Sequence, residues 1–203
     1  MRVRLLSPYG QNLAKAIWEA GDDVLYQSDE GYAEVCVMYG HREILRAEEI
    51  AQYRGVINIH PSMLPYGRGA HPNFWAWHDG EPHGVTMHYV VDEGVDTGPI
   101  IATAAVEFAM PERETLNSSY MELHEAAERL FALKWPEVRN GAPSYPQIGQ
   151  GSLHRKKDLE PLWPLLSKGW DSPVTEVIEL GRRSRGLASN AMDAVGSGRV
   201  ASA

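Results

Sequence analysis

The sequence has little cysteine and no long apolar run, and each shortage narrows what the protein can be. The single cysteine, Cys36, excludes an internal disulfide and fits a reducing compartment. Its neighbours Val35 and Val37 mark it as a buried thiol. No run approaches the roughly 18 apolar residues of a membrane span. We therefore expect no membrane contact and a cytoplasmic location.

Clustered positive charge is also scarce. The net charge is −8 over 203 residues, and the dense basic groups at 154–157 and 182–185 are short and late in the chain. Binding a phosphate backbone usually requires a clustered basic surface. We therefore expect no nucleic acid as the main partner, although one patch could still hold a single phosphate.

Histidine is plentiful, with eight residues, but the pattern is not that of a metal site. Four histidines in the middle of the chain lack the i, i+4 spacing of a zinc helix: His71, His78, His83 and His88. We expect neither a structural nor a catalytic metal.

The remaining sequence alternates between strand and helix patterns. Apolar residues alternate over 3–5, recur at helical spacing over 13–20, and run almost continuously at 33–40 and 56–59. Continuous runs are typical of strands covered on both faces, and strand–helix alternation favours a parallel α/β sheet. We also expect strands at 23–27, 84–91 and 99–108, short helices at 44–53 and 71–79, and a long helix from Leu116 that Pro136 ends or kinks.

The last quarter of the chain differs in composition. It is rich in proline and tryptophan after Gly141, and small, polar and glycine-containing from Gly181 onward. We expect a catalytic domain over 1–150, a small extension over 151–180 and a flexible tail over 181–203.

The stretch "VINIHPSMLPYGRG" at 56–69 raises the question of chemistry. Residues two apart in a strand face the same way, so Asn58 and His60 share one face. Ligands of open α/β sheets bind beyond the carboxyl ends of strands, where this pair would lie. Taken alone, such a pair is more often satisfied by hydrogen bonds in a buried turn.

A second segment, "VVDEGVDTG", favours a catalytic role. It places Asp92, Glu93 and Asp96 among glycines that allow tight turns. Asparagine can donate to a developing oxyanion, histidine can exchange a proton near neutral pH, and a carboxylate can orient that histidine. Because no serine or cysteine nucleophile is evident, direct attack by an amine on a bound acyl donor is the simplest reaction.

Together, "INIHPSMLPYGRGAHP" and "GVTMHYVVDEGVDTGPII" resemble the folate-dependent formyltransferase family. The resemblance extends from "AEVCVMYGHREIL" to "SYPQ" and is greatest to the nucleotide-sugar N-formyltransferases. It implies an α/β fold with a Rossmann-like, mostly parallel sheet and flanking helices. The chain departs from the family pattern in its shortened N-terminal part, since only about 33 residues precede "AEVCVMYG", and we expect a small C-terminal extension.

The resemblance implies that Asn58, His60 and Asp96 are catalytic and that 10-formyltetrahydrofolate is the co-substrate. An acceptor amine would attack the formyl carbon while Asn58 and protonated His60 stabilise the oxyanion and Asp96 holds His60. The implied contacts to the folate are Arg42, Ile44, Leu45, Val91, Asp92, Glu93, Gly94 and Val95. Substrate contacts are expected at Arg68, Gly69, His71 and His88.

The acceptor stays open at this point. "RGAHPNFWAW" and the short segment beyond Gln147 favour a small amine, in particular a nucleotide-linked amino sugar, over a tRNA. The basic group at 154–157 would either contact a diphosphate or form a solvated surface. Gly10 and Asn12 would form either a phosphate loop or, more simply, an ordinary strand-to-helix turn.

Other functions remain as alternatives. One is a formyltransferase of the glycinamide ribonucleotide type, and another is a formyltetrahydrofolate deformylase, which would use the same three polar residues. A third is a binding relative without an efficient acceptor site. A homodimer is the common default for a chain of this kind.

Overall fold

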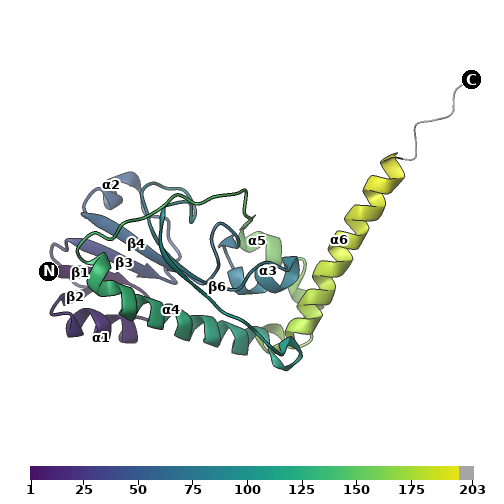
Figure 1. Ribbon diagram of the computed structural model, residues 1–203, viewed down its shortest axis with the longest axis horizontal. Helices are drawn as coiled ribbons and strands as arrows, with labels where there is room; N and C mark the ends of the chain where they lie inside the picture. The colour runs from purple at the N-terminus through teal and green to yellow at the C-terminus, as the bar shows by residue number, and fades with distance from the viewer. Residues whose placement is uncertain (197–203) are drawn as a thin grey trace, which may run out of the picture.

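A computed structural model of the protein describes residues 1–196, with side chains described as far as residue 186. Within these residues a six-stranded mixed sheet, of strand order β2-β1-β3-β4-β6-β7, lies between helices (Figure 1). The strands are β1 (Arg2–Leu6), β2 (Asp23–Tyr26), β3 (Val35–Tyr39), β4 (Gly55–His60), β6 (Gly84–Tyr89) and β7 (Ile100–Ala105), with β5 (Arg68–Gly69) and β8 (Leu153–His154) in a separate pair. The helices are α1 (Gln11–Glu19), α2 (Ala47–Ile50), α3 (Pro72–Asp79), α4 (Leu116–Val138), α5 (Lys156–Leu159) and α6 (Val174–Gly196), with short 3-10 turns η1 (Pro111–Arg113), η2 (Trp163–Leu165) and η3 (Gly169–Asp171).

Strands β2, β1, β3 and β4 run parallel and confirm the expected sheet. A parallel crossover usually contains a helix, but residues 27–34 connect β2 to β3 without one among the described residues. The Arg4 guanidinium holds this connection by donating to the carbonyl oxygens of Tyr26 (2.6 Å), Asp29 (2.6 Å) and Gly31 (2.8 Å). The N-terminal part is therefore short because a loop held by Arg4, and not a helix, connects these two strands.

Strands β6 and β7 extend the sheet beyond β4 in antiparallel register. Asn58 of β4 lies opposite His88 of β6, and His60 lies opposite Thr86. The second half of β4 is therefore the point where the parallel and antiparallel halves of the sheet meet. The loop at 90–99, which joins β6 to β7, returns toward this point.

Each face of the sheet has its own apolar cluster. Helices α1 and α4 lie side by side on one face, where Leu13, Ile17 and Phe131 are fully buried (Figure 1). On the other face, Leu45 packs with Cys36 beside α2. Burial raises the pKa of the Cys36 thiol to about 12, as expected for a structural cysteine.

Two helices differ from their expected bounds. The helix expected over 44–53 is shortened to α2, because the Arg46 N–H donates to the Glu49 carboxylate (2.8 Å) and this cap begins the helix at Ala47. Conversely, α4 continues through Pro136 to Val138. Pro136 lies in the last turn, where the helix loses little hydrogen bonding, and the burial of Val138 in the core holds that turn.

The segment after Gly151 packs mainly against α3. Phe74 and Trp75 of α3 form a buried cluster with Leu159, Leu166 and Val177. In this way the C-terminal segment covers the helix that follows the strand-end loop.

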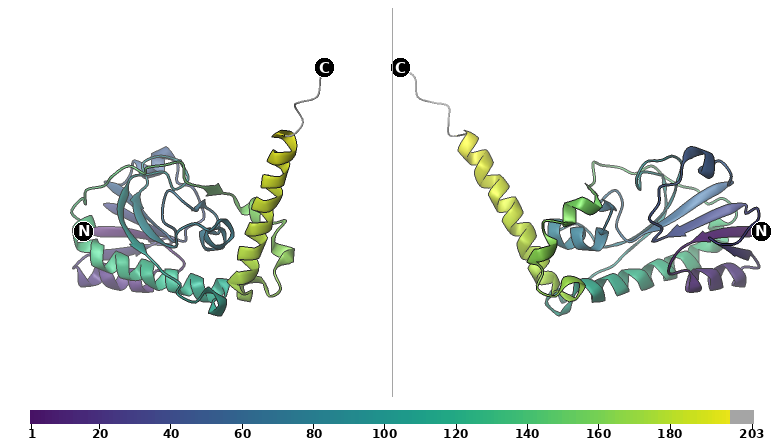
Figure 2. Two further views of the ribbon diagram at one scale, coloured as in Figure 1. Left: turned by 45° about the vertical axis from the view of Figure 1, so that its right-hand side comes forward. Right: turned by 180° about the vertical axis from the view of Figure 1, so that it is seen from behind.

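Helix α6 corrects the expected tail. Where we expected flexibility from Gly181, the backbone is helical to Gly196, and residues 197–203 of that tail lie outside the described residues. Gly181 permits close packing, because an added Cβ would lie 1.7 Å from the His78 carbonyl oxygen. Arg185 also donates to that carbonyl at the end of α3. Beyond this contact α6 stands away from the body of the molecule (Figure 2).

Both long helices, α4 and α6, mix charged and apolar residues along their length. Accordingly, among residues 1–196 no helix is long and apolar enough to cross a membrane.

Candidate active site

The site begins on β4, whose alternation places its side chains as the sequence predicts. Ile57 and Ile59 are each 1% exposed and pack into the core on one face. Asn58 and His60 point to the opposite face, and His60 is 6% exposed. A strand covered on both faces thus delivers two polar side chains to one buried position.

The loop at 90–99 brings Asp96 to the same position. The Asp96 backbone has φ 51°, a left-handed conformation that is uncommon outside glycine. Gln147 stabilises this conformation, since its Nε2 donates to the carbonyl oxygens of Asp96 (2.7 Å) and Gly98 (2.9 Å). Gly98 is required here, because an added Cβ would lie 1.7 Å from the Tyr89 carbonyl oxygen.

Four polar contacts converge on the Asp96 carboxylate. Its Oδ1 lies 3.0 Å from Asn58 Nδ2, 3.6 Å from His60 Nδ1 and 3.4 Å from His88 Nε2. Its Oδ2 accepts a hydrogen bond from the Gly69 backbone N–H (2.9 Å). The three residues that were expected to be catalytic therefore lie together, and His88, expected at the substrate, joins them.

The charge of this cluster follows from its partners. Burial of the Asp96 side chain, which is 12% exposed, would raise its pKa. His60, His88 and the Gly69 N–H together lower the pKa further than burial raises it. The pKa of Asp96 therefore lies well below its ordinary value, and its carboxylate is an anion throughout the neutral range.

The two histidines are oriented by backbone carbonyls. His60 Nε2 lies 2.8 Å from the Gly67 carbonyl oxygen, and His88 Nδ1 lies 3.0 Å from the Tyr89 carbonyl oxygen. These contacts assign a hydrogen to His60 Nε2 and to His88 Nδ1. The other ring nitrogen of His88, Nε2, lies 3.2 Å from Asn58 Nδ2 and 3.4 Å from Asp96 Oδ1, so it faces both groups.

This arrangement can polarise a carbonyl group and move a proton. Both hydrogens of the Asn58 amide are engaged, one by Asp96 and one by His88. His60 Nε2 has the Gly67 carbonyl oxygen at hydrogen-bond distance, and its Nδ1 faces the Asp96 carboxylate at 3.6 Å, so a positive charge on this ring would lie beside a fixed anion. An amide donor, a titratable ring and a fixed anion are the groups that acyl transfer to an amine requires.

The two segments expected to hold the folate lie next to each other. The Ala47 N–H donates to the Glu93 carboxylate (3.1 Å), which connects the end of the 40–45 segment to the 91–96 loop. Ile44, Val91 and Val95 are 61%, 58% and 37% exposed, so three apolar side chains stay open. Among the described residues, no backbone hydrogen bond forms at Val91 or Val95. Open apolar side chains beside unpaired backbone groups fit a flat heteroaromatic ligand such as a pterin.

Other residues of these segments have internal contacts. Leu45 is 9% exposed and packs in the core, so of the two expected apolar walls only Ile44 is open. Asp92 accepts from the Gly94 N–H (2.8 Å), and Gly94 leaves no room for a Cβ beside Thr97. Asp92 and Gly94 therefore shape the loop, whereas Arg42 is exposed.

The expected substrate residues take different roles. Arg68 is fixed to the carbonyl oxygens of Ser152 and Gln150 (3.3 and 3.1 Å). Gly69 has φ 88°, and an added Cβ would lie 2.2 Å from the His154 carbonyl oxygen. His71, half-buried, has φ 58° and precedes α3 with its ring against Trp170.

The segment at 7–13 is an ordinary turn in this structure. Leu13 is fully buried in the core, and Asn12 Nδ2 donates to the Glu128 carboxylate (2.8 Å). A carboxylate at this position would repel a phosphate, so the simpler interpretation of the segment holds.

Several residues that support the site received no role from the sequence alone. Gly67 orients His60 through its carbonyl, and Gln147 fixes the Asp96 loop. Neither carbonyls nor single glutamines leave a pattern in one sequence. Trp163 and Trp170, which lie near His71, were signalled only by the richness of that segment in tryptophan.

The family model and the relatives described here are all formyltransferases. The family model described as "Formyl transferase" matches residues 10–133. A dTDP-4-amino-4,6-dideoxyglucose formyltransferase of Mycobacterium bovis is 34% identical over 107 residues, covering 52% of this chain and 44% of that protein. A phosphoribosylglycinamide formyltransferase of Escherichia coli is 34% identical over 120 residues, covering 58% of this chain and 56% of that protein. The chain thus spans about half the length of the curated relatives it matches.

Among solved structures, the formyltransferase PseJ from Anoxybacillus kamchatkensis is similar over 89% of this chain and 100% of its own, at 34% identity and a TM-score of 0.81. That crystal structure is a complex with UDP-4,6-dideoxy-4-formamido-L-AltNAc and tetrahydrofolate. The mixed six-stranded sheet with flanking helices is therefore shared with a protein that binds a folate and a nucleotide-linked sugar.

Proposed function

The chain belongs to the formyl transferase family, and from that premise we propose that it moves a formyl group from 10-formyltetrahydrofolate to the amine of a nucleotide-linked sugar. The observation that carries the proposal is the convergence of Asn58, His60 and His88 on the buried carboxylate of Asp96. Such a cluster is costly to bury for structural reasons alone. Its chemistry fits acyl transfer to an amine.

In the proposed reaction the acceptor amine forms a new C–N bond to the formyl carbon, and the bond from that carbon to the folate N10 breaks. The proton that the amine loses ends on the folate nitrogen, so the products are a formamide and tetrahydrofolate. Asn58 transfers one of its two N–H donors from His88 to the oxygen that gains negative charge.

His60 and Asp96 stabilise the charges that develop as the amine proton is transferred. Protonated His60 adds a positive charge beside the developing oxyanion, while Asp96 and the Gly67 carbonyl hold its ring in place. Because Asp96 stays ionised, it supports the positive charge on His60 and helps, directly or through a water, to draw the proton from the attacking amine on its way to the folate nitrogen.

The folate would lie across the joined segments at 40–45 and 91–96. Ile44, Val91 and Val95 would cover the faces of the pterin, and the unpaired backbone groups at Val91 and Val95 would recognise its polar edge. Arg42 would lie at the rim, where a cation could contact the negative tail of a folate. Glu93 would keep the two segments together through its bond to Ala47.

The acceptor class is supported by the similarity to PseJ over the whole length of that chain. The Asn12–Glu128 contact gives no support to a phosphate loop at 7–13, which is the feature of this chain that resembles the ribonucleotide enzyme. A sugar amine attached to a nucleotide is therefore the acceptor that we favour.

The proposal is tested by following tetrahydrofolate release from 10-formyltetrahydrofolate with a panel of amines. The panel contains nucleotide-linked 4-amino and 3-amino sugars, glycinamide ribonucleotide, and no amine. We expect release with one amino sugar and its loss in His60→Ala, whose fold is checked by circular dichroism. His83→Gln is the matched control, because the His83 ring packs against Trp77 and Phe108 outside the cluster.

Other outcomes would name a different enzyme. Equal release without any amine would make the protein a deformylase, and release only with glycinamide ribonucleotide would contradict the sugar acceptor. Undiminished release by a folded His60→Ala variant would contradict the assignment of the cluster.

A further inference from the structure

A small pocket lies beside the cluster, and the proposed reaction leaves it without a role. Its volume is about 270 Å3. It is lined by the residue before α3, by α5 and by the turns η2 and η3: His71, Lys156, Leu159, Glu160, Trp163 and Trp170. This volume is slightly below that of typical small-molecule sites, which begin at about 300 Å3. It suits one part of a ligand whose remainder extends outside.

The pocket is connected to the Asp96 carboxylate through one pair of backbone segments. The Gly69 N–H binds Asp96, and Gly69 pairs with His154 through β5 and β8. His71 and Lys156 each lie two residues beyond this pair. Two extended residues span roughly 7 Å. In a ligand whose amine lies at Asp96, the group that enters the pocket would therefore be separated from that amine by about the length of one sugar ring.

The wall of the pocket is aromatic and open to solvent. Trp163 and Trp170 are 37% and 45% exposed, and their ring centroids lie 4.6 Å apart at 57°. The His71 ring lies 5.4 Å from Trp170. Exposed indoles that form one concave surface are the usual platform for a flat heterocycle, since any base has a face that can stack.

The rim of the pocket carries positive charge in an otherwise acidic chain. Burial lowers the pKa of His71, and the charges of Lys156 and Arg42 lower it further, so these two cations act on the same point. Lys156, which lines the pocket beside the stacking platform, suits a diphosphate. Glu160 is an acceptor for sugar hydroxyl groups.

We propose that this pocket binds the nucleoside diphosphate half of the acceptor, with the base on Trp163 and Trp170 and the diphosphate at Lys156. The placement rests on the proposed function, because it assumes that the acceptor amine meets Asp96. The folate is then left to the segments at 40–45 and 91–96, which do not line the pocket.

The first test is binding without turnover. Uridine 5′-diphosphate and thymidine 5′-diphosphate are titrated into the full-length protein, and tryptophan fluorescence is recorded. We expect quenching in the wild type and affinity that is weaker by about tenfold in Trp163→Ala and Trp170→Ala, as for the loss of one stacked base. Lys156→Ala, an exposed change that spares the fold, should weaken binding about threefold to tenfold.

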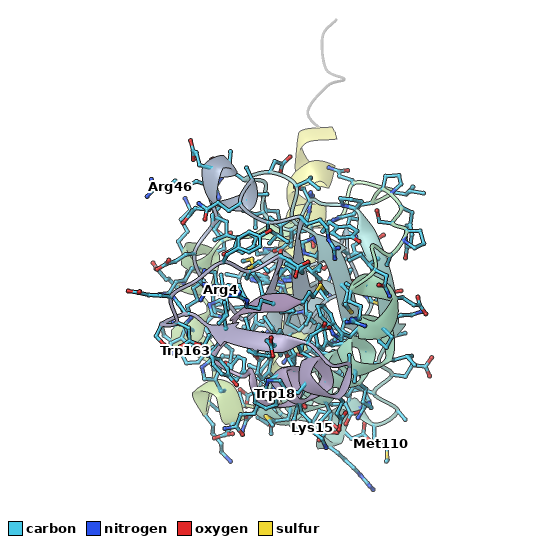
Figure 3. All side chains as sticks on the ribbon, turned by 90° about the vertical axis from the view of Figure 1, so that its left-hand side faces the viewer. Arg4, Lys15, Trp18, Arg46, Met110 and Trp163 are labelled. Carbon is cyan, nitrogen blue, oxygen red and sulfur yellow. The ribbon has the colours of Figure 1, made fainter. Side chains whose placement is uncertain are left out.

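Matched controls come from α1, which carries the side chains of Lys15 and Trp18 (Figure 3) and does not line the pocket. The Lys15 side chain is 69% exposed and Trp18 is 55% exposed. Trp18→Ala and Lys15→Ala should bind both diphosphates as the wild type does. In the turnover assay, Trp170→Ala should raise the KM for the amino sugar about tenfold and leave the KM for 10-formyltetrahydrofolate unchanged.

Three outcomes would overturn the proposal. They are no binding of either diphosphate to the wild type, equal binding by the pocket and control variants, and a raised KM for the folate with an unchanged KM for the sugar. Failure of the proposed function would look different, because the diphosphates would still bind through Trp163 and Trp170 while no amino sugar is formylated.

Discussion

Two buried carboxylates, Asp22 and Asp96, hold different regions of the molecule together and differ in their partners. The Asp22 side chain is 0% exposed and accepts from Arg139 Nε (2.7 Å), Arg139 Nη2 (2.6 Å) and Trp135 Nε1 (3.2 Å). It thereby fixes the start of β2 to the end of α4. The partners of Asp96 are instead an amide, two histidines and a backbone N–H.

The difference separates a structural anion from a reactive one. Burial would raise the pKa of Asp22, but Arg139 and the Met1 amine together lower it more, as His60, His88 and the Gly69 N–H do for Asp96. The guanidinium of Arg139 never gives up its proton at accessible pH, whereas histidine exchanges one readily. Similar burial and charge therefore serve stability in one region and proton transfer in the other.

The largest expected effect is on turnover at the Asp96 cluster. Asp96→Asn keeps the shape but removes the anion that supports a charged His60. We expect kcat to fall by about a thousandfold, or about 4 kcal/mol of transition-state stabilisation. The free energy of unfolding should also fall, because the ionised carboxylate stabilises the folded state, so kcat is measured per folded molecule. Turnover within tenfold of wild type would erase the contrast with Asp22.

The reverse pattern is expected at Asp22. Asp22→Asn leaves the Arg139 guanidinium without its buried counter-charge and should lower the free energy of unfolding by about 3 kcal/mol. The kcat per folded molecule should stay at the wild-type value. Urea unfolding and the turnover assay on the same preparation measure both, and a large loss of kcat without loss of stability would reverse the comparison.

A smaller effect should arise from Gln147, which supports Asp96 without contacting its carboxylate. Gln147→Ala leaves the carbonyl oxygens of Asp96 and Gly98 without a donor, so the loop should sample positions away from His60. We expect kcat to fall about tenfold. Gln150→Ala is the matched control, because only the backbone of Gln150 makes a contact, to Arg68. Equal kcat values for the two variants would contradict the proposed role of Gln147 in positioning Asp96.

The smallest effect concerns His83, a titratable group with no such partner. Its Nδ1 is buried without a hydrogen-bond partner among the described residues, and burial lowers its pKa from 6.5 to about 4. As the pH falls from 6.5 to about 4, the unfolded chain takes up a proton that the folded ring refuses, so stability is lost. His83→Phe should remove about 1 kcal/mol of the loss between about pH 7 and pH 5.5.

The aspartates should not contribute to that loss. The folded pKa of each lies below the ordinary value of 3.8, so their stabilisation is fully present above 3.8 and is lost only as the pH falls toward the folded value. Unfolding curves at several pH values, for wild type and His83→Phe, separate the two contributions. Identical pH dependence of the two proteins would contradict the role of His83.

Much of the site was open to prediction because its signals are local. Strand alternation alone places Asn58 beside His60, and a loop of acidic and glycine residues marks Asp96. The supports of these residues were not predictable in the same way. Gln147 reaches Asp96 across 51 positions of the chain, and Gly67 acts through a carbonyl that every residue has.

In the fold, too, the features that depend on local sequence were predicted, and those that depend on packing were not. Apolar periodicity predicted the strands and the helices α1 and α4, but it did not predict that α4 continues through Pro136 or that the backbone is helical from 181 to 196. Both features depend on contacts that only packing provides: the burial of Val138 in the core, and the close approach of Gly181 to the His78 carbonyl.

The sequence by itself determined the class of fold, the polar residues at the end of β4 and the resemblance to a folate-dependent formyltransferase, because periodicity and short motifs are properties of neighbouring residues. Only the tertiary structure decided that His88 and Gln147 join Asp96, that Asp22 binds Arg139, and that Trp163 and Trp170 open beside His71. Those contacts join segments remote along the chain. Their distances and burial are set by how the helices and loops pack on the sheet.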